Sequence, residues 1–268
     1  MPQVSLAKGT VNLEVVGQGP TTLTFVHGLG PGAAAWELVT QGMPDGWRTL
    51  APDLPGFGAT ERGGFGGDID AAATVVHHTL HAFGQLSAGA LIGHGYGALV
   101  ALSFASRYPA HVDRLVMIGS GAFVRDVAAV AIRHDDVLGH GWDTERAEAW
   151  LNSGLVETLE DPHFAAMRDA TAGLDADLVV GCLAAMMQAE LLEVVRTLRA
   201  PLLLIRGEHD RLVSDDDLAI VTARASDATV ATIPAAGHWP HLEAPDELRA
   251  ALRGFIEPGA PSAAEERA

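Results

Sequence analysis

The chain has 268 residues, of which 48 % are hydrophobic and 19 % are charged, a globular composition that excludes a wholly disordered chain. Its 17 basic and 34 acidic residues give a net charge of −17, which repels phosphate backbones and argues against a nucleic-acid partner. No apolar stretch reaches the ~18 residues of a membrane span, so we expect no membrane association. The first residues lack the pattern of a secretory signal, and Cys182 is the only cysteine. We therefore expect a cytoplasmic protein without disulfides.

Short apolar runs and helical spacing alternate through the first 120 residues. These patterns predict strands over 11–17, 22–28, 48–56, 89–95 and 113–120, and helices over 68–84 and 96–109. The first helix begins at Asp68 and ends at Gly84, and the second is stopped by Pro109. Strands separated by helices imply βαβ units and a mostly parallel sheet.

The strand pattern stops between residues 121 and 199. Helices are expected there over 129–138, 144–159 and 177–198, and strands resume over 201–210 and 228–238 before a last helix over 244–256. The sequence thus predicts an α/β core made of residues 1–120 and 200–257 and a helical cap made of residues 121–199. Residues 258–268 are expected to form a flexible polar tail. Such a cap would cover the C-terminal edge of the sheet, where open α/β folds bind ligands.

The strongest motif is Gly93-His94-Gly95-Tyr96-Gly97, between a buried strand and a helix. A sharp strand-to-helix turn flanked by glycines is the nucleophile elbow, normally G-x-S-x-G. Its central residue sits in a strained backbone conformation, which glycine tolerates with little steric cost. The fold should therefore survive Gly95, but without a hydroxyl no acyl-enzyme can form at this position.

Two more motifs follow in the chain order of a serine hydrolase. Asp210 comes after a late strand, and His238 follows the last strand. An aspartate there would hold the imidazole in one tautomer and stabilise its protonated form. Glu208 is the alternative acid.

A second glycine-rich loop, His27-Gly28-Leu29-Gly30, lies at the end of the strand expected over 22–28. Loops of this type offer a backbone N–H to an oxyanion, and a second N–H comes from the residue after the elbow centre, here Tyr96. The loop lacks the Lys-Ser/Thr ending of a P-loop and the spacing of a dinucleotide fingerprint. We therefore expect an oxyanion site and no cofactor.

Over essentially its whole length the chain resembles the α/β-hydrolases. The runs HGLGPGAAAW (27–36) and PDLPGFGAT (52–60) and the GHW at 237–239 are similar to those of the meta-cleavage-product hydrolases, which break a C–C bond in ring-opened aromatic compounds. The resemblance implies an α/β-hydrolase fold, a mostly parallel sheet flanked by helices with a helical cap insertion. Two residues depart from the pattern: Gly95 replaces the serine, and His94, more typical of esterases and lactonases, replaces the usual Asn.

The resemblance also implies roles for particular residues. Asp210 and His238 match the family's acid and base. Leu29 and Tyr96 match its oxyanion-hole positions, and Trp239 matches the aromatic neighbour of the base.

Substrate contacts are expected from Trp36, Trp239 and Arg168. The two tryptophans would line a pocket at the sheet edge, beside apolar cap residues such as Met186. Arg168 is the candidate for the family's cap arginine, which meets a substrate carboxylate. This set predicts a partly apolar substrate with an acidic group.

The remaining polar residues have structural interpretations. Cys182 is expected to be a buried apolar residue, and the pattern gives structural or surface roles to His77, His78, His81, His94, His209 and His241. No set of His, Cys, Asp and Glu has the spacing of a metal site, so no metal is expected.

Three functions stay open at this stage. The favoured one is a C–C or ester hydrolase that acts on a small, partly apolar carbonyl compound through His238 and Asp210, with Gly95 either natural or an inactivating substitution. The alternatives are a lyase, isomerase or cyclase that needs only the base and the oxyanion donors, and a ligand-binding protein without activity. The expected partner is a small-molecule substrate, and a homo-oligomer stays open.

Overall fold

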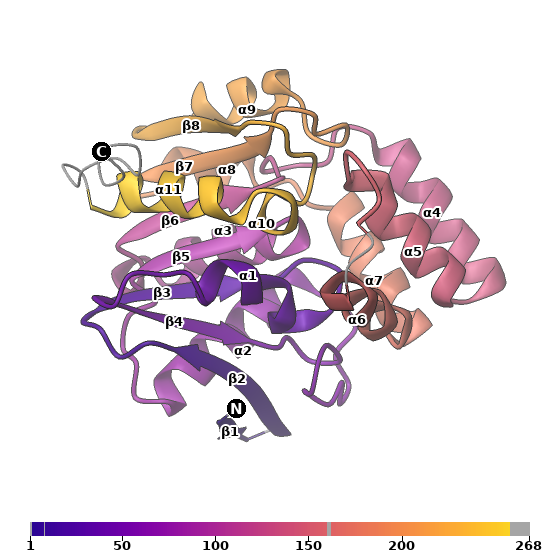
Figure 1. Cartoon of the computed structure of the whole chain (residues 1–268), viewed down its shortest axis with the longest axis horizontal. Helices are drawn as coiled ribbons and strands as arrows, with labels where there is room; N and C mark the ends of the chain where they lie inside the picture. Colours follow the sequence, from indigo (N-terminus) through magenta and orange to yellow (C-terminus); the bar gives the residue numbers. More distant parts are fainter. Residues whose placement is uncertain (1, 8, 160–161, 258–268) are drawn as a thin grey trace.

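The computed structural model describes residues 2–7, 9–159 and 162–257 (Figure 1). These residues form an eight-stranded sheet in the order β1-β2-β4-β3-β5-β6-β7-β8. β2 pairs antiparallel with β1 and β4, and every other neighbouring pair is parallel. From β1 to β8 the strands span Gln3–Leu6, Gly9–Val16, Thr21–Val26, Trp47–Pro52, Ala90–His94, Arg114–Ile118, Leu202–Gly207 and Ala228–Ile233.

Helices cover both faces of the sheet. Those of the core are α1 (Glu37–Thr40), α2 (Ile69–Ala82), α3 (Tyr96–Arg107), α9 (Asp215–Thr222), α10 (Pro240–Glu243) and α11 (Pro245–Ile256), with 3-10 turns η1 (Gly32–Trp36) and η2 (Pro109–His111). Leu115 and Met117 of β6 pack with α2, α3 and α9, whereas Val116 and Ile118 pack with α1 and α11. This alternation follows from the two-residue period of a strand, and it confirms the predicted α/β fold.

A helical insertion lies between β6 and β7. Its helices are α4 (Val127–His140), α5 (Thr144–Gly154), α6 (Pro162–Ala172), α7 (Ala176–Met187) and α8 (Leu192–Thr197). α4 to α7 gather at one end of the sheet, beyond the carboxyl ends of the parallel strands (Figure 1). α8 instead packs on α3. The four-helix group from α4 to α7 is called the cap below.

Two cap helices are shorter than their patterns predict. The helix expected over 144–159 ends at Gly154, because the next residue adopts an extended conformation. The stretch 177–198 is divided into α7 and α8 by a segment in which Glu190 bridges Phe123. The tail predicted over 258–268 lies outside the described residues.

Among the described residues, no single helix is long and apolar enough to cross a membrane, although α6 and α7, bent by 94° at their junction, together reach the necessary length and composition.

Candidate functional site

Gly95 occupies the sharp turn between β5 and α3. Its φ of 53° and ψ of −118° lie in a region that L-amino acids with side chains rarely adopt. Neither flanking glycine has room for a side chain: a Cβ on Gly93 would lie 2.3 Å from the Gly97 carbonyl oxygen, and one on Gly97 would lie 2.3 Å from the carbonyl oxygens of Val26 and His27. The strand and helix therefore approach closely, and the geometry is that of an elbow.

Asp210 and His238 meet beside this elbow. The carboxylate Oδ2 of Asp210 lies 3.0 Å from Nδ1 of His238. Its Oδ1 accepts hydrogen bonds from the amides of Leu212 and Val213, at 2.8 and 3.0 Å. Burial alone would raise the pKa of Asp210, but the contacts with His238 and with these amides outweigh it, and the pKa is lowered. Asp210 is thus an ionised acceptor that fixes the orientation of the ring.

Glu208, the alternative acid, lies away from His238. Its side chain is 55 % exposed, and its carboxylate accepts a hydrogen bond from the amide of Ala235 at 3.1 Å. The structure therefore pairs His238 with Asp210 and not with Glu208.

The second ring nitrogen of His238 faces the elbow. A Cβ built on Gly95 would lie 3.9 Å from Nε2 of His238, and apart from its two chain neighbours no other atom of the described residues would come within 4 Å of it. Since Nδ1 is held by Asp210, Nε2 is the nitrogen that can accept a proton from a molecule above Gly95. A serine hydroxyl at this position would reach it.

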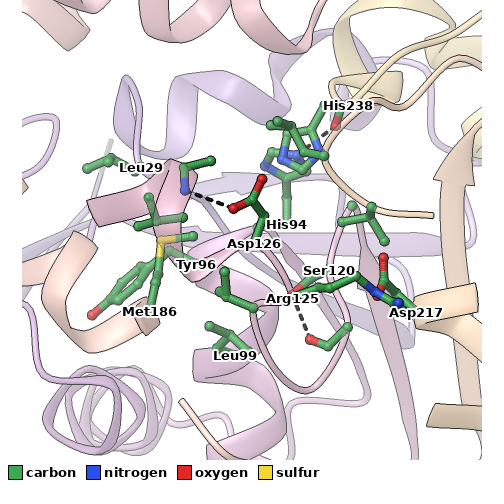
Figure 2. Close-up of a pocket in the computed structure, with 18 of the residues that line it drawn as sticks. Leu29, His94, Tyr96, Leu99, Ser120, Arg125, Asp126, Met186, Asp217 and His238 are labelled. Atoms are coloured by element: carbon green, nitrogen blue, oxygen red, sulfur yellow. Dashed lines mark hydrogen bonds and ion pairs between the residues drawn. The ribbon is translucent and has the colours of Figure 1, made fainter. Parts of the chain in front are cut away.

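Leu29 and Tyr96 both line a cavity whose wall also includes Gly95 and His238 (Figure 2). Within the described residues, the Leu29 amide has no hydrogen-bond acceptor, which leaves it able to donate to a ligand. The loop before it is held from below, because Nε2 of His27 accepts a hydrogen bond from the Leu54 amide at 2.9 Å. The Tyr96 side chain points away from Gly95 and donates to the Gly67 carbonyl at 2.8 Å.

The cavity has a volume of about 160 Å³ and lies between the sheet edge and the cap. Gly95, His238 and Trp239 contribute to its wall, together with apolar groups of the cap such as Met186 (Figure 2). Trp36 does not reach it: the side chain is fully buried against Phe25 and His241.

Arg168 does not line this cavity either. It lies on α6 and pairs with the neighbouring Asp169 at 3.0 Å. The cavity wall instead contains Arg125, Arg133 and Arg211. Sequence reasoning missed Arg133 because a helical pattern does not reveal which side of α4 faces the core, whereas Arg125 and Arg211 lie in loops before α4 and after β7.

The three arginines differ in their partners. Arg125 forms an ion pair with Asp217, whose side chain is 8 % exposed, and Arg211 is exposed. Arg133 has no carboxylate partner within the described residues; its guanidinium lies 5.1 Å from the centre of the Trp150 ring. Burial lowers the pKa of Arg133, although a guanidinium remains charged at neutral pH. Arg133 is therefore a partly desolvated cation on the cavity wall.

Two further histidines are buried behind the site. His94 directs Nε2 to the His238 carbonyl oxygen at 2.9 Å, and its ring centre lies 4.5 Å from that of His241. Burial, with the nearby histidine charges, lowers the pKa of His94 well below its usual value, and burial lowers that of His241 to about 3. Both rings are therefore neutral at pH 7 and act as packing groups around His238.

Within the described part of the chain, no group of three or more His, Cys, Asp and Glu side chains could hold a metal ion. The histidines of α2, which are His77, His78 and His81, pack with aromatic rings: the His77 ring stacks on Tyr108 with ring centres 3.9 Å apart.

Comparison with known proteins gives a family and several relatives. The model of the alpha/beta hydrolase family matches residues 25–251. The chain is similar to 2-(acetamidomethylene)succinate hydrolase of Mesorhizobium japonicum, with 24 % identity over 264 residues that cover 95 % of this chain and 94 % of that protein. It is also similar to 2-hydroxymuconate semialdehyde hydrolase of a Pseudomonas species, with 38 % identity over 106 residues, or 37 % of this chain and 36 % of that protein.

Solved structures show the same fold. The enol-lactonase from Burkholderia xenovorans LB400 superposes with a TM-score of 0.85 at 17 % identity, over 95 % of this chain and 99 % of that one. The family match spans the elbow, Asp210 and His238.

Proposed function

Because this chain belongs to the alpha/beta hydrolase family, we propose that it hydrolyses a small, partly apolar carbonyl compound that carries a carboxylate. In this proposal His238 activates a water molecule directly, and no acyl-enzyme forms. The observation that carries it is the geometry above Gly95, where Nε2 of His238 faces space that a serine side chain would fill.

The proposed reaction uses each group in turn. Nε2 of His238 takes a proton from water, and the hydroxide oxygen bonds to the carbonyl carbon of the substrate. The amides of Leu29 and Tyr96 donate to the oxyanion of the tetrahedral intermediate. When the intermediate collapses, the C–N, C–O or C–C bond to the leaving group breaks, and protonated His238 returns its proton to that group. Asp210 stabilises the imidazolium throughout.

Arg133 is the proposed partner of the substrate carboxylate. The cavity wall is mostly apolar, Arg125 is already neutralised by Asp217, and Arg133 is a partly buried cation without a carboxylate partner among the described residues. A guanidinium in such a place binds a carboxylate strongly. The substrate named for the Mesorhizobium relative is a succinate derivative, and a succinate derivative carries the carboxylate that Arg133 would bind in this proposal.

The assignment can be tested with matched arginine variants. Arg133→Met keeps an apolar stem in the wall, and Arg168→Met removes the cap arginine that lies outside it. If Arg133 binds the carboxylate, the first variant should weaken binding of succinate derivatives about 10- to 100-fold in calorimetric titrations, while neutral amides and esters bind as before. Equal binding of acidic ligands to Arg133→Met and the unchanged protein contradicts the assignment, and a loss confined to Arg168→Met restores the sequence-based one.

Turnover in H₂¹⁸O tests the reaction class. Acidic amides, enol lactones and ring-opened aromatic acids should be converted with one ¹⁸O atom in the acyl product, and His238→Ala should lower the rate by about 10²–10⁴-fold. Conversion without ¹⁸O would indicate the lyase, isomerase or cyclase alternative. Binding without any conversion would indicate a ligand-binding protein.

A further inference from the structure

The C-terminal part of cap helix α5 contacts two loops beside the elbow, the one that contains Leu29 and the one that contains His238. On one side, the indole Nε1–H of Trp150 donates a 2.8 Å hydrogen bond to the carbonyl oxygen of Leu29. This bond joins residues 121 positions apart in the chain. It ties the cap to the loop whose amide is the expected oxyanion donor.

On the other side, the same helix holds the loop that carries the base. The carbonyl oxygen of Gly154 accepts a 2.6 Å hydrogen bond from the His238 amide. A Cβ on Gly154 would lie 2.4 Å from Nε1 of Trp239 and 2.8 Å from Cβ of His238, so any larger residue would push this loop away.

A carboxylate completes the connection just beyond the helix. Glu243 accepts a hydrogen bond from the cap amide of Val156 through Oε1, at 2.7 Å, and one from the Gly237 amide through Oε2, at 2.9 Å. Gly237 directly precedes His238. The segment from Trp150 to Val156 is therefore bonded to both loops that the proposed reaction uses.

We propose that Trp150 is a positioning residue, which sets the oxyanion loop against His238 through its bond to the Leu29 carbonyl. Holding this carbonyl restricts rotation of the loop, so that the Leu29 amide keeps its direction toward the cavity. The same indole ring lies 5.1 Å from the Arg133 guanidinium, and it therefore links the proposed carboxylate contact to the oxyanion loop. This inference rests on the proposed function for the roles of Leu29 and Arg133.

The chain offers a matched control. The indole of Trp142, also in the cap region, donates a 2.8 Å hydrogen bond to the carbonyl of Thr171, which is part of α6 and not of either loop. Trp150→Phe and Trp142→Phe each remove one indole N–H and keep an aromatic ring. A difference between them therefore reports the particular bond to Leu29 and not the loss of any tryptophan.

Hydrogen exchange in the unchanged Gly95 background decides the positioning step. With Trp150→Phe, amides of the loop over 27–32 should exchange roughly 2- to 10-fold faster, the effect of one lost hydrogen bond, while amides of β5 stay as protected as before. Trp142→Phe should leave the loop unchanged. Identical loop exchange in Trp150→Phe and the unchanged protein overturns the proposal. If Trp150→Phe does not fold, exchange of the Trp150 indole proton in the unchanged protein decides instead: exchange as fast as in free indole overturns it.

Kinetics in a Gly95→Ser background test whether the position matters for chemistry. With a neutral activated ester, the added Trp150→Phe should lower kcat about 10-fold and change KM less than 2-fold, since removal of a whole oxyanion donor costs about 10²–10³-fold. An unchanged kcat overturns the proposal even when exchange is faster. If Gly95→Ser hydrolyses no ester at all, the proposed elbow chemistry fails, whereas the exchange experiment still decides whether Trp150 positions the loop.

Discussion

Replacement of Gly95 by alanine probes the elbow backbone without adding a reactive group. Gly95 has a φ of 53°, and beyond its chain neighbours a Cβ there would meet, among the described residues, only Nε2 of His238, at 3.9 Å. Because space is not limiting, the cost is backbone strain of about 1–3 kcal/mol. The reduced freedom of the unfolded chain offsets about 0.4–1 kcal/mol of it. We therefore expect Gly95→Ala to lower the free energy of unfolding by about 1–2 kcal/mol.

Gly95→Ser should be less destabilised than Gly95→Ala. Its hydroxyl can form a hydrogen bond with Nε2 of His238, which contributes about 0.5–1.5 kcal/mol. In a His238→Ala background the two variants should be equally stable, because the bonding partner is gone. Urea unfolding followed by circular dichroism measures these differences, and the thermal midpoint of Gly95→Ala should fall by about 2–8 °C.

A helical glycine supplies the control for any Gly-to-Ala effect. Gly139 lies in α4, and a Cβ built there has no atom of the described residues within 4 Å apart from those of its chain neighbours and its own helix backbone, so Gly139→Ala should stabilise the protein by up to about 1 kcal/mol. The reasoning about strain is refuted if Gly95→Ala is as stable as the unchanged protein, or if it gains stability as Gly139→Ala does.

Two further predictions concern buried groups. Burial lowers the pKa of His241 from 6.5 to about 3. Between these two pH values the unfolded chain binds a proton on His241 that the folded chain does not. The contribution of His241 to the free energy of unfolding should therefore be greatest above pH 6.5 and fall below it by up to about 1.4 kcal/mol per pH unit. Urea unfolding at pH 7 and pH 5 measures this slope, which His241→Leu should reduce; an identical slope in the variant contradicts it. Cys182 is fully buried, and burial raises the pKa of its thiol to about 12. It should therefore resist Ellman's reagent at pH 8 until urea is added, and rapid labelling of the folded protein would contradict this placement.

The elbow and its partners were predictable because their signals are local. A glycine at 93, 95 and 97 between a strand and a helix specifies one kind of turn. Asp210 and His238 each follow a parallel strand, and the carboxyl ends of such strands meet at one edge of the sheet. Chain order and topology were therefore enough to bring these two residues together.

The cavity wall was not predictable, because it depends on how the cap helices pack. Arg133 lies on α4 and Arg168 on α6, yet only Arg133 lines the cavity. Trp36 follows the oxyanion loop in sequence, but η1 turns it into the core beside Phe25. Tertiary packing decided both cases, and a single sequence carries no information about it.

One missed helix did have a signal. The N-cap residue of α9 is Ser214. Its hydroxyl accepts a hydrogen bond from the Asp217 amide, and the Asp217 carboxylate accepts one from the Ser214 amide. This reciprocal capping box is readable as S-x-x-D before an apolar run. β1 carried no such signal, because it has only four residues at the sheet edge and only Val4 among them is buried.

Mass spectrometry after treatment with a serine-directed fluorophosphonate tests most directly whether His238 acts without a covalent partner at position 95. The unchanged protein should gain no adduct in the peptide that contains Gly95. Gly95→Ser should gain one adduct at that position, and the added His238→Ala should slow its formation by about 10²–10⁴-fold. An adduct on a cavity-lining residue of the unchanged protein, or a folded Gly95→Ser protein that stays unlabelled, would contradict the proposed role of His238.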